Sequence, residues 1–191
     1  MSLDKLTIVG AGLLGGSLGI AAKERGLAKR VTALVRRPES VSECQALGVA
    51  DEVTLDEAEA ISDTDLIVLC TPVASMAGLA KRWLPHLKNG AVVTDVGSTK
   101  RQLVAELTPM IAGAGAHFVG SHPMAGSAQA GPSAARADLF DGAVCVVTPT
   151  DATDAEALIS VNEFWENLGS EPVAMSAEDH DQLVARCSHL P

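Results

Sequence analysis

A short apolar run ending in three spaced glycines, close to the start of the chain, constrains the fold more than any other stretch. Residues 6–15 read LTIVGAGLLG, which places the pattern G-x-G-x-x-G directly after a predicted strand. The first glycine permits a sharp turn, the second lets a pyrophosphate approach the backbone, and the third lets the next helix pack on the strand. The N–H groups of the first helical turn then face the phosphates. The stretch predicts a dinucleotide-binding βαβ unit with contacts from Gly10, Gly12, Leu13, Leu14 and Gly15.

The same stretch resembles a membrane-spanning or signal segment in one respect, because residues 6–22 carry no charge. These 17 residues are short for a membrane span, and five of them are glycines. A signal peptide needs a basic start, whereas Asp4 and Lys5 cancel. We therefore expect no membrane segment, no targeting segment and a cytoplasmic location.

Composition limits the classes to which the chain can belong. Of its 191 residues, 47% are hydrophobic, which is ample for one globular domain. A net charge of −10 with 3% aromatic residues argues against a nucleic-acid partner, because such proteins use basic patches and stacking rings. The four cysteines lack the spacing of a metal site, so we expect reduced thiols and no metal.

Predicted strands and helices alternate along the chain, which indicates an α/β fold with a doubly wound, mostly parallel sheet (Rossmann-like). Residues 124–136 lack periodicity and are expected to form a loop over the carboxyl edge of the sheet, where such folds bind ligands. Strands are predicted at 6–9, 31–35, near 53, and at 66–70, 91–95, 118–120, 143–148 and 172–175. Helices are predicted at about 13–25, 38–47, 73–84, 100–111, 153–168 and 176–189.

The chain ends inside a predicted helix. We assign residues 1–175 to the dinucleotide-binding domain and residues 176–191 to the start of a helix with no stop signal. The expectation is a truncated chain that leads into an absent helical domain.

Two arginines follow the second predicted strand, where NAD-binding units carry an acidic residue for the ribose hydroxyls. Here that place holds Val35, followed by Arg36 and Arg37. No carboxylate repels a 2′-phosphate, and guanidinium groups bind phosphate bidentately. The pattern favours NADP over NAD, with Arg36 as the first candidate. The alternative is a solvated pair of surface arginines.

A polar segment, Asp95-Val96-Gly97-Ser98, follows one buried strand. Ser98 could simply cap the next helix. However, Thr99-x-x-Gln102 makes a better capping box, which would leave the Ser98 hydroxyl free for a ligand.

A histidine follows the next predicted strand. His122 is expected at the same sheet edge as the glycine turn, where a neutral imidazole could accept a proton from a substrate hydroxyl during hydride transfer. A lone histidine is more often structural, and His86 and His117 have positions typical of that. His180 and His189 lie on the last predicted helix and cannot be assigned by spacing alone.

Five motifs together resemble the prephenate/arogenate dehydrogenase family of tyrosine biosynthesis. In order they are GAGLLGGSL, CTPV, DVGSTK, GSHPMAGS and HDQLVARCSHLP, and they extend over essentially the whole chain. The resemblance implies oxidative decarboxylation of a cyclohexadienyl substrate, with hydride transfer to NADP⁺ or NAD⁺. It also implies a homodimer formed through a C-terminal helical domain, which would make this chain weakly active or inactive alone.

The resemblance also implies roles for individual residues. His122 would hydrogen-bond the 4-hydroxyl of the substrate with support from Ser98, and these two are the expected catalytic residues. Further cofactor contacts would come from Thr71, Pro72, Asp95, Val96 and Gly97. Further substrate contacts would come from Gly126, Ser127 and His189.

The sequence departs from the family pattern at several points. Ala128 stands where many relatives carry Glu, which with Arg36 favours arogenate slightly over prephenate. The resemblance places the arginine that would bind a substrate carboxylate in the helical domain that is expected after residue 191. Two other functions stay open, a reductase of the β-hydroxyacid or pyrroline-carboxylate type and a non-catalytic NADP-binding regulatory module.

Overall fold

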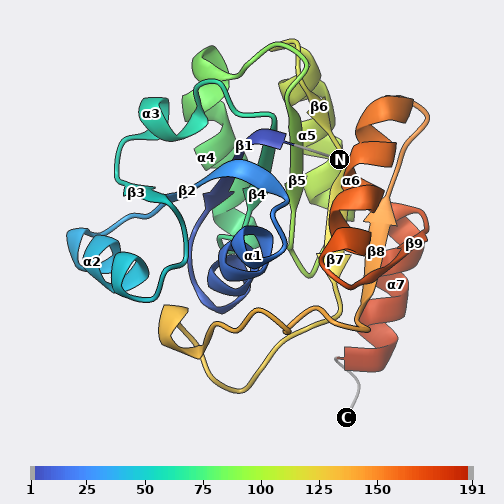
Figure 1. Ribbon diagram of the computed structural model, residues 1–191. Coiled ribbons are helices and arrows are strands. Elements are labelled where there is room, and N and C mark those ends of the chain that lie inside the picture. Colours follow the sequence, from blue (N-terminus) through green and yellow to red (C-terminus); the bar gives the residue numbers. More distant parts are fainter. Residues whose placement is uncertain (1–2, 189–191) are drawn as a thin grey trace.

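A six-stranded parallel sheet forms the centre of the computed structural model, which describes residues 3–188 (Figure 1). The strand order β3-β2-β1-β4-β5-β6 is that of a doubly wound sheet, so the predicted fold class is confirmed. The central strands β1, β4 and β5 are almost entirely buried, as expected for a sheet covered by helices on both faces, whereas the edge strand β3 has no buried residue. The strands are β1 Leu3–Val9, β2 Ala28–Leu34, β3 Glu52–Thr54, β4 Leu66–Leu69, β5 Val92–Asp95 and β6 His117–Phe118.

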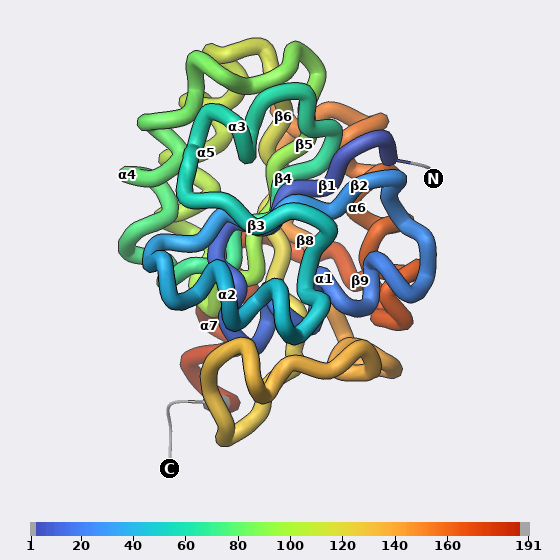
Figure 2. Tube along the Cα trace, turned by 60° about the vertical axis from the view of Figure 1, so that its left-hand side comes forward, coloured from blue at the N-terminus to red at the C-terminus, as the bar shows by residue number. Residues whose placement is uncertain are grey.

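Helices cover both faces of this sheet and enclose two apolar clusters. One cluster joins β1 and β2 to helices α1 (Leu13–Glu24), α2 (Pro38–Ala46) and α6 (Ala155–Asn167). The other joins the opposite face to α3, α4 and α5, which span Glu57–Ile61, Val73–Trp83 and Arg101–Ala112. Figure 2 views the molecule from the β3 edge, with α4 and α5 on one side of the sheet and α6 on the other.

A second, three-stranded sheet follows the first and corrects one prediction. A single strand was expected at 118–120, with His122 after it. Instead, β6 ends at Phe118, and after Val119 the chain enters β7 (Gly120–Pro123), which pairs antiparallel with β8 (Val144–Thr148). The apolar run continues through this change of sheet, so periodicity could not reveal it. His122 therefore lies within a strand and is held by backbone pairing to β8.

The last two elements complete the small sheet and pack against helices that cover the large one. Strand β9 (Glu171–Ala174) pairs parallel with β8, and helix α7 (Ala177–Ser188) packs against α5 and β8. His180 and Val184 of α7 are buried. Within the described residues, α7 is therefore part of the same folded unit. None of the helices between residues 3 and 188 is long and apolar enough to cross a membrane.

Candidate functional site

The glycine turn has the geometry expected of a phosphate-binding turn. Gly10 has a φ of +96°, which favours glycine, and Gly15 leaves no room for a Cβ atom beside the Gly10 carbonyl. By contrast, a Cβ atom added at Gly12 would meet no heavy atom within 4 Å. Helix α1 has no side-chain cap and no acidic residue in its first turn. Its free N–H groups and the open space at Gly12 therefore fit a pyrophosphate.

A cavity of about 670 Å³ lies beside this turn, within the size range of small-molecule sites. Thr71 contributes a buried hydroxyl oxygen that has no hydrogen-bond partner in the described structure. Such an orphaned polar group is typical of a site completed by a ligand. The cavity therefore fits the nucleoside part of a dinucleotide. Its lining includes Gly10, Val35, Arg36, Thr71, Pro72 and Arg82.

The two predicted arginines have different positions. Both are exposed, but Arg36 lines the cavity, whereas Arg37 lies at the start of α2 and is not among the lining residues. A further guanidinium, that of Arg82, also lines the cavity and pairs with Glu57 at 2.5 Å. Sequence reasoning missed Arg82, although Ser75, Leu79 and Arg82 have the spacing of one helical face.

The segment after β5 is built on a buried ion pair. Asp95 and Lys100 are both 0% exposed and bonded to each other. The Asp95 carboxylate also accepts hydrogen bonds from the backbone N–H groups of Gly97 and Ser121, at 2.7 and 3.1 Å. Burial raises the pKa of Asp95, while Lys100 and the two N–H donors oppose that shift.

The Asp95 side chain is therefore closed to a ligand, and the expected cofactor contact from Asp95 stays a prediction for its backbone. Val96 and Gly97 are buried as well. The segment acts as a rigid support for Ser98, which is exposed. The Ser98 hydroxyl forms no hydrogen bond with the residues that the structure describes, as predicted.

The reason why Ser98 is free differs from the predicted one. No side chain of the expected Thr99-x-x-Gln102 box caps α5, and Gln102 instead bonds Glu106. The carboxylate of Asp181, on α7, accepts hydrogen bonds from the backbone N–H groups of Lys100 at 2.7 Å and Arg101 at 3.0 Å. A distant helix therefore caps α5.

Asp181 also begins a chain of side chains that leads to His122. His180 Nδ1 lies 2.8 Å from Asp181 Oδ1, and His180 Nε2 lies 2.9 Å from His122 Nδ1. The two imidazole rings meet edge to face with centroids 5.1 Å apart. His180 is 0% exposed, whereas His122 is only partly buried and open to a ligand. Sequence reasoning left His180 unassigned and missed Asp181, although both belong to the HD pair of the last motif.

The environment of His122 keeps its imidazole neutral at pH 7. Burial, with additional contributions from His180 and Lys100, lowers the pKa of His122 to about 4, and Asp181 opposes this shift. Burial tends to raise the pKa of Asp181. However, its hydrogen bonds from the Arg101 and Lys100 backbones and from His180 lower that pKa overall. The arrangement therefore presents a neutral imidazole that can accept a proton.

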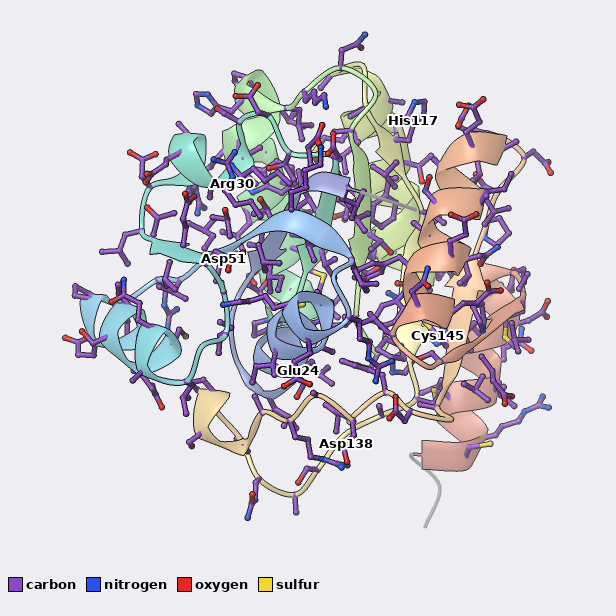
Figure 3. The ribbon with its side chains drawn as sticks, in the orientation of Figure 1. Glu24, Arg30, Asp51, His117, Asp138 and Cys145 are labelled. Atoms are coloured by element: carbon purple, nitrogen blue, oxygen red, sulfur yellow. The ribbon has the colours of Figure 1, made fainter. Side chains whose placement is uncertain are left out.

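The loop predicted at residues 124–136 directly follows β7, the strand that contains His122. Arg136 donates its backbone N–H to Ser17 Oγ at 3.0 Å, which fixes the end of the loop against α1. Gly126 and Ser127 are exposed in it. Figure 3 shows His117 at the opposite end of the molecule from Asp138, which follows this loop. His189 lies outside the described residues.

No metal cluster competes with this interpretation within residues 3–188, where groups of three His, Cys, Asp or Glu side chains in metal-binding positions are absent. Leu13 and Leu14 pack against the apolar cluster rather than lining the cavity. The structure thus brings Gly10, Arg36, Thr71 and Pro72 to one cavity. It places His122 in a separate arrangement with His180 and Asp181, which is tied to the Ser98 segment.

Comparisons with known proteins agree with this geometry. The family model described as "Prephenate dehydrogenase, nucleotide-binding domain" matches residues 18–174. A cyclohexadienyl dehydrogenase of Zymomonas mobilis is 36% identical over 97% of this chain and 63% of its own length. The chain also resembles two solved structures. The prephenate dehydrogenase of Aquifex aeolicus, in complex with hydroxyphenyl propionate and NAD⁺, has a TM-score of 0.92 and 32% identity. An arogenate dehydrogenase of Synechocystis has a TM-score of 0.87 and 32% identity.

These similarities extend over nearly all of this chain but not of the relatives. The two solved structures are matched over 99% and 97% of this chain, and over 65% and 64% of their own chains. The chain therefore spans less than two thirds of the length of the three relatives.

Proposed function

The chain belongs to the prephenate dehydrogenase family, as its nucleotide-binding domain, and from this premise we propose that it serves the oxidative decarboxylation of arogenate or prephenate. The observation that carries the proposal is the neutral imidazole of His122, held by His180 at the edge of the site. A bound nicotinamide supplies one chemical capacity, the acceptance of a hydride. The residues of this chain bind and orient the cofactor and the substrate, and they remove a proton from the substrate.

His122 acts as the proton acceptor in this proposal. Its imidazole hydrogen-bonds the 4-hydroxyl of the cyclohexadienyl ring and takes the hydroxyl proton as C4 gives up hydride. Loss of carbon dioxide then makes the ring aromatic, and the protonated imidazole returns the proton to the resulting phenolate oxygen, which regenerates the base. Since aromatisation drives the reaction, the protein mainly has to position the substrate and hold the base deprotonated. Ser98, with its free and exposed hydroxyl, is the second group that we place against the substrate.

The proposed cofactor is NADP⁺, and Arg36 is the residue that distinguishes it from NAD⁺. Arg36 lines the cavity together with Val35, and no acidic residue follows β2 at this position. Glu57 also lines the cavity, but its carboxylate is paired with Arg82. The mouth of the cavity therefore favours an additional phosphate.

Replacement of Arg36 by Ala is expected to weaken NADP⁺ binding about 10- to 100-fold, because a charge-assisted hydrogen-bonding contact contributes about 1.5–3 kcal/mol. NAD⁺ binding should change less than about twofold, since NAD⁺ has no 2′-phosphate. Fluorescence titration of this chain with both dinucleotides measures the effect. Arg37→Ala is the matched control, because Arg37 does not line the cavity. Equal loss of both affinities in Arg36→Ala, or equal affinities in the unchanged chain, would contradict the proposal.

We place arogenate ahead of prephenate as the substrate. Ala128 is small, uncharged and exposed in the loop that follows His122. We further propose that a homodimer forms through residues beyond this domain, with the remaining substrate contacts.

The function is tested by turnover in the longest reading frame that encodes this sequence. Reduced NADP should form with arogenate, more slowly with prephenate, and one carbon dioxide should be released per reduced cofactor. A regulatory module would bind NADP⁺ without turnover of either substrate. A β-hydroxyacid reductase would instead turn over a hydroxyacid without releasing carbon dioxide.

A further inference from the structure

We propose that Asp181 and His180 are positioning residues that fix the tautomer of His122, and that Asp181 also fixes the segment bearing Ser98. The proposal rests on the proposed function for its catalytic consequence. Its structural content, the position of one proton on His122, can be tested separately.

The donors and acceptors in the series Asp181, His180 and His122 determine which ring nitrogen carries each proton. An ionised carboxylate can only accept, so His180 Nδ1, which lies 2.8 Å from Asp181 Oδ1, must carry a proton. A neutral imidazole carries a single N–H, so His180 Nε2 is an acceptor. His122 Nδ1, 2.9 Å away, must then donate to it. His122 Nε2 is left with a free lone pair, which is the form that a proton acceptor requires.

The carboxylate of Asp181 links this chain to the second candidate group. In addition to His180, it accepts the backbone N–H groups of Lys100 and Arg101. These residues directly follow the segment in which Ser98 lies. A single partly buried carboxylate between α7 and α5 thus holds both the base and the exposed hydroxyl, although neither Asp181 nor His180 needs to touch a substrate.

Leu at position 181 removes the acceptor without a large change in side-chain size. Asp181 Oδ1 accepts both from His180 Nδ1 and from the Lys100 N–H, so an amide at this position could keep its oxygen there and leave His180 unchanged. A Leu side chain accepts from neither group. His180 can then carry its proton on Nε2 and donate to His122 Nδ1, which moves the proton of His122 to Nε2 and turns the acceptor into a donor.

The test is the tautomer of His122 in this chain with ¹⁵N-labelled histidine, read from long-range ¹H–¹⁵N spectra at pH 7. We expect the Nδ1–H form in the unchanged chain and the appearance of the Nε2–H form in Asp181→Leu. Asp179→Leu is the matched control, because Asp179 lies on the same helix and, among the described residues, bonds Ser176 alone. The Nε2–H form in the unchanged chain, a doubly protonated His180, or an unaltered tautomer in a folded Asp181→Leu would each overturn the proposal.

The catalytic consequence is tested by steady-state kinetics on the protein encoded by the longest reading frame that contains this sequence. Asp181→Leu should lower kcat roughly 10-fold or more with little change in the KM for NADP⁺, because a base in the wrong tautomer cannot accept the proton. His180→Gln should retain more activity than His180→Leu, since an amide oxygen can still accept from His122 Nδ1. Equal activity of these two variants would contradict the positioning role. Should the proposed reaction itself be wrong, the tautomer result would still stand or fall on its own.

Discussion

Replacement of His122 by Asn is expected to lower kcat by about 10²–10⁴-fold, the usual contribution of general acid–base catalysis. Asn can accept a hydrogen bond from the substrate hydroxyl but cannot take up its proton. NADP⁺ affinity should change less than about twofold, because His122 does not line the cavity beside the glycine turn. Formation of reduced cofactor in the longest reading frame measures kcat, and fluorescence titration measures the affinity.

His117→Asn is the control for this variant, because His117 begins β6 and lies at the opposite end of the molecule from Asp138 and the loop that follows His122 (Figure 3). Its kcat should stay within about twofold of the unchanged enzyme. A His122→Asn enzyme with unaltered kcat would remove His122 from the chemistry and with it the observation on which the proposed function rests.

The pH dependence of kcat/KM is a second test of His122 as the base. The acceptor form of His122 is present above its pKa and lost below it, and that pKa is about 4. Thus kcat/KM should not fall through loss of this base between pH 7 and pH 5. His180 and Lys100 both act to keep His122 neutral, while Asp181 acts in the opposite direction. A loss of activity centred near pH 6.5 would show that His122 titrates like an exposed histidine.

Local spacing allowed the sequence to predict the glycine turn and the doubly wound sheet. In the turn, Gly10 has a backbone angle that favours glycine, and Gly15 approaches the Gly10 carbonyl too closely for a Cβ atom. Because both requirements select glycine at fixed positions, the spacing of the glycines indicates the turn. Similarly, alternating strands and helices restrict the sheet to a few arrangements. The division between β6 and β7 was missed because both belong to one continuous apolar run.

Contacts between distant segments explain what the sequence could not predict at the site. The Thr99-x-x-Gln102 spacing predicted a local cap, but Asp181, 81 positions from Lys100, provides it. Likewise, nothing in the spacing distinguishes a carboxylate that faces a ligand from one that is buried beside a lysine. Asp95 is of the second kind, and only the fold reveals it.

That buried pair leads to the largest stability effect that we expect. Replacement of Lys100 by Met should lower the free energy of unfolding by about 3–5 kcal/mol, the usual result of removing one partner of a buried ion pair. The cost arises because the Asp95 carboxylate, 0% exposed, loses the charge that compensates it. Chemical denaturation at pH 7 measures the change. Lys88→Met is the control, because Lys88 pairs with Asp65 at the surface and should contribute only about 0–1 kcal/mol.

Two further measurements identify the uncompensated charge as the cause. The double variant Asp95→Asn/Lys100→Met should recover part of the loss, since an amide needs no counter-charge and can still accept from a backbone N–H. In Lys100→Met alone, the pKa of Asp95 should rise further, so the folded state binds more protons than the unfolded state as the pH falls. The difference in unfolding free energy from the unchanged chain should therefore shrink between pH 7 and pH 5. A difference that is independent of pH, with no recovery in the double variant, would mean that Lys100 contributes through the packing of its side chain and not through its charge.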